Sequence, residues 1–207
     1  MKIVDLENSI AEKLFVAMGT CIPLIRQELA NETIYAFTVF CASGCTSMGV
    51  AVSTRESVAD RIHENPALDI PSDVIQMNAA EWKYLNIHHE LFADVEMVID
   101  DFYDCLHDSG FDEEDDAQFL DKNSDYFNEF ARDFFTRIVI RAFSQLKQAG
   151  DLRGTPFEDD LLLGIQFPDP SPTGIYMIRE ISSQINSNVW HDRIEQNCRY
   201  LEQFRDT

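Results

Sequence analysis

The side chains that most resemble a metal site in this sequence lie in the run His88-His89-Glu90. A zinc-binding helix with the pattern His-Glu-x-x-His needs its second histidine four residues after the first, on the same helix face. Ala93 occupies that position. Cys41 and Cys45 form another candidate pair, but no second cysteine pair follows, and buried thiols are the better interpretation. We therefore expect no metal ion and no cofactor.

Oxygen ligands are concentrated in the acidic run Asp112-Glu113-Glu114-Asp115-Asp116. A calcium-binding EF-hand loop that begins at Asp112 would need Gly at its sixth position and a bidentate Glu at its twelfth. Those positions hold Ala117 and Asn123. The run is consistent with weak, non-selective association of divalent cations, and it does not indicate a dedicated calcium site.

Signatures of nucleophilic or phosphate chemistry do not occur in the sequence. It contains no Gly-x-Ser-x-Gly nucleophile elbow and no known signature around a cysteine. It has only 8 glycines and no Gly-rich phosphate loop. Carboxylates are too abundant for one pair to be singled out as an acid and a base. We expect no catalytic residues, with a small enzyme or ligand-binding domain, its site near Glu81, Trp82 and Tyr84, as the alternative.

The most informative feature of the sequence is its concentration of negative charge. The chain has 37 Asp and Glu residues against 16 Lys and Arg residues, a formal net charge of −21. Residues 94–116 carry eleven acidic side chains and no Lys or Arg. Like charges held close together oppose the compact state, so we expect the protein's function to use them. A negative surface attracts a basic protein and repels nucleic acid and anionic membranes.

We therefore predict a binding surface for a basic protein in the middle of the chain, and no direct binding to nucleic acid or to a membrane. A solvated acidic helix without a partner is the alternative. Interfaces are enriched in Trp and Tyr, so nearby aromatic residues are candidate anchors, although a core position explains each of them equally well. The predicted partner-binding residues are Asp94, Asp100, Asp101, Asp104, Asp108, Asp112, Glu113, Glu114, Asp115, Asp116, Trp82, Tyr84 and Tyr103.

Length and composition indicate one globular domain over residues 1–207. A hydrophobic content of 45% is enough for one substantial core. The acidic segment 108–121 is expected to be mobile. We expect neither a secretory signal nor a membrane span, because no early apolar run precedes a cleavage site and no stretch of about 18 uncharged apolar residues occurs. The 5 cysteines are an odd number in a chain too large to need disulfides, which favours a cytoplasmic protein with reduced thiols.

Hydrophobic periodicity predicts the elements that position these residues. Apolar side chains spaced three and four apart predict helices over 6–29, 91–106, 126–149, 174–185 and 189–204. Pro23 predicts a kink or break near Thr20 in the first helix. Gly150 is expected just after the end of the third helix. The run Ser53-Thr-Arg-Glu56 matches a capping box and predicts a further short helix.

Runs of β-branched and aromatic residues predict four strands. Those at 33–41 and 48–53 are separated by a short turn and predict a hairpin. The other two cover 80–85 and 160–167. The order of the elements predicts an α+β domain in which several helices pack on a small, mainly antiparallel four-stranded sheet.

Five short motifs, in this order, resemble a bacterial family that is known only as a domain of unknown function. The motifs are Glu32-Thr-Ile-Tyr-Ala-Phe, Val52-Ser-Thr-Arg-Glu56, Glu81-Trp-Lys-Tyr84, Asp160-Leu-Leu-Leu-Gly-Ile and Ile181-Ser-Ser-Gln-Ile-Asn186. The resemblance covers nearly the whole chain. It implies a small cytoplasmic α+β protein without established catalytic residues, of a kind often encoded near polymorphic toxin systems.

This resemblance and the acidic run together suggest an immunity-type protein. Such a protein would bind a cognate toxin domain, often a cationic one, and block it stoichiometrically. Charge complementarity would raise the association rate, and no chemistry would be required. A general cytoplasmic interaction or regulatory protein, including a mimic of nucleic acid, is a further alternative.

Overall fold

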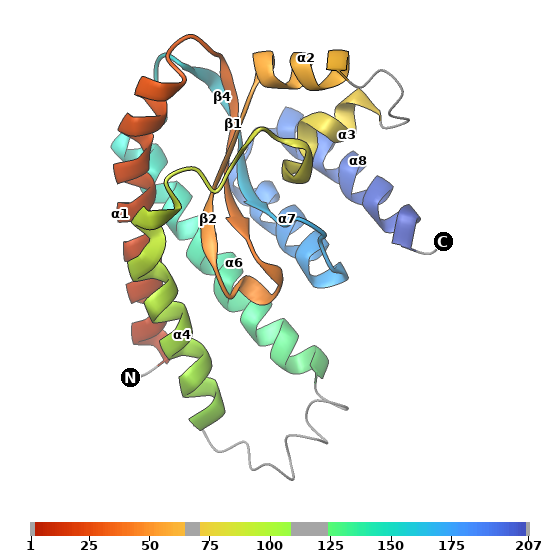
Figure 1. Ribbon diagram of the computed structural model, residues 1–207. Helices are drawn as coiled ribbons and strands as arrows, with labels where there is room; N and C mark the ends of the chain where they lie inside the picture. Colours follow the sequence, from red (N-terminus) through yellow and green to blue (C-terminus); the bar gives the residue numbers. More distant parts are fainter. Residues whose placement is uncertain (1–2, 65–70, 109–123, 206–207) are drawn as a thin grey trace.

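The computed structural model describes residues 3–64, 71–108 and 124–205 (Figure 1). Four strands form one sheet in the order β3-β2-β1-β4. β1 (Ile34–Cys41) pairs antiparallel with β2 (Met48–Thr54), which pairs antiparallel with the short β3 (Tyr84–Leu85). On its other side, β1 pairs parallel with β4 (Phe157–Gln166). The predicted α+β class and the predicted hairpin are confirmed.

The prediction of a mainly antiparallel sheet is wrong, because the sheet is mixed. β4 follows the long helix α6 (Ser124–Ala149), which returns the chain to the end of the sheet at which β1 begins (Figure 1). β4 therefore enters the sheet in the same direction as β1. Hydrophobic patterning shows which residues of a strand are buried, and it does not show the direction in which the strand enters a sheet.

A bulge near the start of β1 changes the direction of one important side chain. Ile34 pairs with Thr54 and Ala36 pairs with Ser53, so Tyr35 is an extra residue in the ladder. Tyr35 stacks on Trp190 at a ring distance of 5.9 Å, whereas Phe37 meets Phe143 of α6. Without the bulge, residues two apart would lie on the same face of the sheet.

The predicted third strand is wrong over most of its length. Only Tyr84 and Leu85 form the β3 strand, and Ala79–Glu81 form a short 3₁₀ helix, η2. Trp82 lies between them and is 5% exposed. Its indole N–H donates to the carbonyl oxygens of Ile75 and Gln76, so the aromatic residue holds this segment without a strand.

The predicted capping box is displaced by one residue. Helix α2 (Arg55–Glu64) follows β2 directly, and the reciprocal bonds join Thr54 and Ser57. The Ser57 amide donates to Thr54 Oγ1, and the Thr54 amide donates to Ser57 Oγ. Ser53 is buried in β2 instead, and Glu56 accepts bonds from Thr33.

Seven helices of the described residues surround the sheet. α1 (Ile3–Glu28) and α4 (Ala93–Asp108) run side by side, with the 3₁₀ helix η3 (His89–Phe92) before α4 (Figure 1). α6 contacts α1 and α7 (Pro172–Ile185), and α7 contacts β4 and α8 (Asn188–Arg205). α3 (Ser72–Met77) contacts α8. The buried apolar residues form one continuous cluster.

The predicted break in the first helix is absent, because α1 continues through Pro23. Its buried stripe includes Met18, Cys21, Ile22 and Ile25, so packing is maintained on both sides of the proline. α1 is the one helix among the described residues that is long and apolar enough to cross a membrane by length and composition. Buried helices of globular cores meet the same criterion, so this finding is weak evidence for a span.

Asn186 occupies the outer edge of β4. Its Nδ2 donates to the Leu163 carbonyl at 2.8 Å, and its Oδ1 accepts from the Leu163 amide at 2.9 Å. This side chain therefore makes both hydrogen bonds that a further strand would make at this residue. Exposed sheet edges favour pairing with other chains, so Asn186 closes part of this edge.

Replacement of Asn186 by Ala is expected to lower the free energy of unfolding by about 1–3 kcal/mol, because a backbone donor and an acceptor lose their partners. Urea denaturation measures the change. Asn188→Ala is the matched control, since Asn188 is exposed, and its effect should stay within about 0.5 kcal/mol. Equal stability of the two variants would show that the edge contact is unimportant.

Candidate protein-binding surface

The carboxylates of α4 lie on its solvent side. Asp94, Asp100, Asp101 and Asp104 are exposed. The opposite side of the helix is buried and is formed by Val95, Val98, Ile99 and Phe102. The period of 3.6 residues per turn separates the two sets of side chains, as the sequence predicts. We call the four exposed carboxylates, with Met97 between them, the α4 acidic face.

Aromatic packing fixes α4 in place. Phe102 is fully buried. Its ring stacks on that of Phe134 in α6, with 4.2 Å between the ring centres and an angle of 16° between the ring planes. The rings of Phe102 and Phe135 form an edge-to-face pair with their centres 5.3 Å apart. Aromatic pairs of this kind contribute about 0.5–1.5 kcal/mol each beyond the area they bury. The acidic face therefore stands on a rigid element.

The carboxylates of this face have few partners within the protein. Asp94 lies 3.7 Å from Lys13 Nζ, and its side chain is 77% exposed. Asp100, Asp101 and Asp104 make no ion pair with any residue that the structure describes. Met97, one turn from Asp94 and from Asp101, is 66% exposed. The face thus combines unpaired negative charge with an apolar side chain at its centre.

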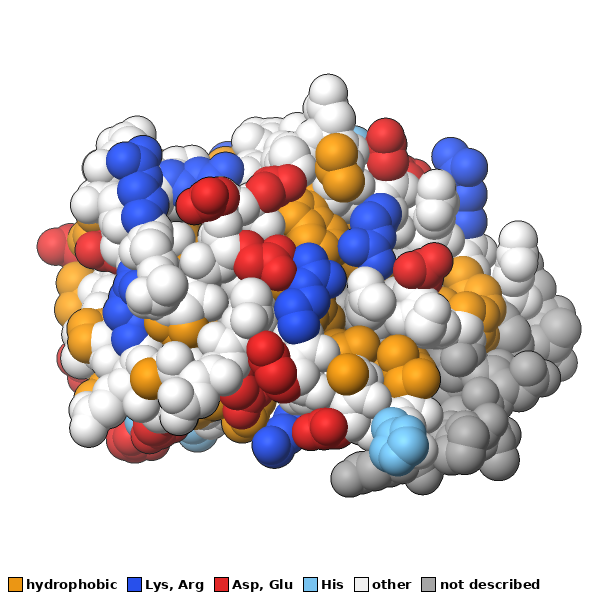
Figure 2. Space-filling view, turned by 90° about the horizontal axis from the view of Figure 1, so that it is seen from above, with side chains coloured by type: hydrophobic (Ala, Val, Ile, Leu, Met, Phe, Trp, Pro, Cys, Tyr) orange, Lys and Arg blue, Asp and Glu red, His pale blue; other side chains and the backbone are white. Residues whose placement is uncertain are grey.

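Several carboxylates on other elements are used in ion pairs. Arg137 pairs with Glu7 at 2.8 Å and Arg179 with Glu202 at 2.5 Å. Hydrogen bonds to these partners raise the pKa of both guanidinium groups. Figure 2 shows the molecule from the top of Figure 1, the end at which α2 lies. On this face, Lys and Arg side chains lie among Asp and Glu side chains. Charge is therefore largely balanced there, unlike on α4.

The rest of the predicted acidic surface lies outside the described residues. This applies to Asp112, Glu113, Glu114, Asp115 and Asp116, and to the predicted mobile segment after residue 108. Asp108 is the last residue of α4, and its side chain is also outside the description.

The three predicted aromatic anchors do not gather on one surface. Trp82 is buried, so it is a core residue and not an exposed anchor. Tyr84 lies in β3, and its hydroxyl donates to Glu32 Oε1 at 2.5 Å. Tyr103 lies on α4, and its hydroxyl donates to the Gly44 carbonyl at the turn of the hairpin. Burial raises the pKa of Tyr103, with the nearby cysteines adding to the shift. Only Tyr103 adjoins the α4 acidic face.

Glu81, Trp82 and Tyr84, the residues of the alternative ligand site, make contacts within the described part of the protein. Glu81 pairs with Arg61 at 2.8 Å. Five cavities bordered by described residues have linings that contain none of the three. Within the described ranges, no three His, Cys, Asp or Glu side chains are placed to hold a metal ion.

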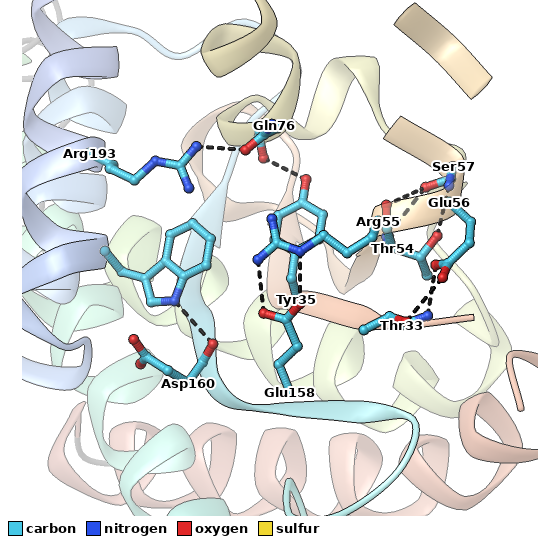
Figure 3. A network of polar contacts seen from close by, with 11 residues as sticks. Thr33, Tyr35, Thr54, Arg55, Glu56, Ser57, Gln76, Glu158, Asp160 and Arg193 are labelled. Atoms are coloured by element: carbon cyan, nitrogen blue, oxygen red, sulfur yellow. Dashed lines mark hydrogen bonds and ion pairs between the residues drawn. The ribbon is translucent and has the colours of Figure 1, made fainter. Parts of the chain in front are cut away.

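Sequence reasoning missed a polar network at the end of the sheet where β1 begins (Figure 3). Arg55 donates to both oxygens of Glu158, at 2.7 and 2.9 Å, and this pairing raises the pKa of Arg55. Its guanidinium lies 4.4 Å from the centre of the Tyr35 ring. The Tyr35 hydroxyl donates to the Gln76 carbonyl, and burial raises the pKa of Tyr35 to about 12.

This network joins elements that are distant in the sequence. Residues 55 and 158 are 103 positions apart, and no local pattern indicates that they meet. Its hydrogen bonds run between residues of different elements, which is typical of a structural contact.

Comparison with protein-family models, with curated proteins and with solved structures finds no match for this chain. The family resemblance therefore stays a hypothesis, and function is inferred from the surface itself.

Glu56 makes the stability of this end of the sheet depend on pH. Partial burial opposes its ionisation, but bonds from the Thr33 amide and hydroxyl and the charge of Arg55 outweigh burial and lower its pKa. A carboxyl whose pKa is lower in the folded state stabilises the fold above its unfolded pKa, and this contribution is lost as the pH falls through the folded value.

We expect Glu56→Gln to be less stable than the unmodified protein at pH 7, by less than about 1 kcal/mol because Glu56 is largely exposed. The difference should vanish in acid, below the folded pKa of Glu56. Urea denaturation at a series of pH values measures it. Glu12→Gln is the control, because Glu12 is exposed in α1. If the difference in stability between Glu56→Gln and the unmodified protein persists unchanged at pH 2.5, the lowered pKa of Glu56 does not stabilise the fold.

Proposed function

We propose that this protein binds a cationic protein through the α4 acidic face and neutralises it, as an immunity-type protein neutralises its cognate toxin domain. The observation that supports this proposal most is the set of unpaired, exposed carboxylates of Asp100, Asp101 and Asp104 on one rigid helix. Charges that stabilised the fold would be expected to have partners within it. These three have none among the residues described, so a partner outside the chain is the better explanation.

The arrangement suits fast and specific association. A field of one sign steers an oppositely charged protein and raises its association rate, most strongly at low ionic strength. A helix whose backbone is already held by packing against the core loses little backbone freedom on binding. Met97, 66% exposed, offers an apolar contact at the centre of the charged face, where water can be excluded.

Two lines of support lead to the toxin-neutralising interpretation: the α4 acidic face and the family resemblance. Stoichiometric inhibition requires tight binding and no catalytic groups, and a face of carboxylates around Met97 suits that task. The same field would repel nucleic acid and anionic membranes. We propose a cytoplasmic location, where the protein would meet an incoming toxin. A general regulatory partner for a basic protein would use the same surface, and the identity of the partner distinguishes the two functions.

The test uses the protein encoded by the adjacent gene as the partner. When expressed alone it should arrest growth, and co-expression of this chain should restore growth. The purified proteins should form a complex that weakens as salt increases. The combined change Asp100→Asn, Asp101→Asn, Asp104→Asn should weaken the complex about tenfold to a hundredfold at low salt and abolish rescue.

The matched control replaces Asp60, Asp159 and Asp192 by Asn, which removes the same charge from exposed positions on other elements. It should bind and rescue as the unmodified chain does. If both triple variants behave alike, the α4 acidic face is not the binding surface. If the unmodified chain fails to bind the adjacent product, the toxin-neutralising function is wrong.

A further inference from the structure

An open groove of about 390 Å³ lies between α1 and the start of α4, two helices that run side by side (Figure 1). Its lining comes from one side of α1, between Ser9 and Thr20, and from Leu91 of η3 and Asp94 of α4. From Ser9 to Thr20 a helix rises about 17 Å, or three turns. The groove therefore follows the axis of α1 and is long enough for a short helix to lie along it.

The middle of the groove is apolar. Val16 is 56% exposed, and Ala17 beside it is buried and forms part of the floor. Leu91 is half-buried and lines the groove from η3. A single exposed valine is normal on a protein surface. Here a second apolar side chain borders the same groove, so one inserted apolar side chain would remove both from water.

Negative charge exceeds positive charge along the groove. Glu12 and Asp94 line it, and both are exposed. Lys13 is the one cation of the lining, and its Nζ lies 3.7 Å from Asp94. Asp94 also belongs to the α4 acidic face, and Asp101 lies two turns further along the same side of α4. The groove is therefore continuous with the α4 acidic face.

We propose that the groove receives an amphipathic basic helix of the cationic partner, so that α1 and α4 bind it together. The proposal rests on the proposed function, because it names the part of the partner that this surface recognises. Apolar side chains three and four residues apart on the partner helix lie against Val16 and Leu91, as in other helix-in-groove complexes. Its Lys or Arg side chains meet Glu12 and Asp94. A second copy of this chain fits the groove poorly, because a net charge of −21 repels itself.

Two synthetic peptides of Leu and Lys test the proposal. Each has about 18 residues, enough to span the groove as a helix. They have the same composition and charge, but only one places its Leu residues on a single helical face. Calorimetric titration at physiological salt should show that the amphipathic peptide binds at least about tenfold more tightly. In NMR spectra of the labelled protein, this peptide should shift the amide signals of residues 9–20.

Val16→Ser removes the exposed apolar wall of the groove without touching the core. It should reduce the preference for the amphipathic peptide to about threefold or less. Val4→Ser is the matched control, because Val4 is 68% exposed on the same helix and does not line the groove. The control should keep the full preference.

A third variant separates this proposal from the proposed function. Asp100→Asn, Asp101→Asn, Asp104→Asn should weaken both peptides equally and leave the preference between them unchanged. If this variant binds both peptides as the unmodified chain does, the α4 acidic face does not attract cations and the proposed function loses its support. If it weakens both, but the unmodified chain binds the two peptides equally, the acidic face stands and the groove proposal is wrong. A dimer of the unmodified chain that Val16→Ser dissociates would also overturn the proposal, because a second copy would then cover the groove.

Discussion

The packing of Phe102 against Phe134 and Phe135 determines where this protein presents its charge. The stack joins α4 to α6, the long helix of the core, and leaves only one side of α4 free for polar residues. Because the buried side is fixed by aromatic contacts, Asp101 and Asp104 are held on the exposed side of the helix. The acidic face is thus a consequence of the core, and a substitution that loosened the stack would disperse the carboxylates.

Charge is distributed in two different ways over the fold. At the end of the sheet where β1 begins, Arg55 and Glu158 neutralise each other and connect strands and helices. On α4, Asp100, Asp101 and Asp104 remain unpaired within the described residues, and Asp94 has only the distant Lys13 beside it. Paired charges thus join elements of the fold, and we propose that the unpaired carboxylates of α4 serve association with a partner.

Sequence reasoning predicted the parts of this structure that depend on local periodicity. The spacing of apolar residues alone predicts the buried side of α4, and with it the outward position of Asp101. The runs of β-branched and aromatic residues predict the hairpin of β1 and β2. The spacing of apolar residues does not show which distant segment a buried side chain contacts. The parallel entry of β4, the bulge that turns Tyr35 toward Trp190 and the burial of Trp82 all depend on contacts between distant segments.

The central claim is that the α4 carboxylates serve a partner and not the fold, and the stability of the free protein tests it most directly. The free energy of unfolding should be measured by urea denaturation at low salt for the unmodified chain and for the chain with Asp100, Asp101 and Asp104 all changed to Asn. Relief of like-charge repulsion predicts a variant that is equally stable or more stable, by up to about 1 kcal/mol. A loss of more than about 1 kcal/mol would show that these carboxylates hold the fold together and would contradict the account.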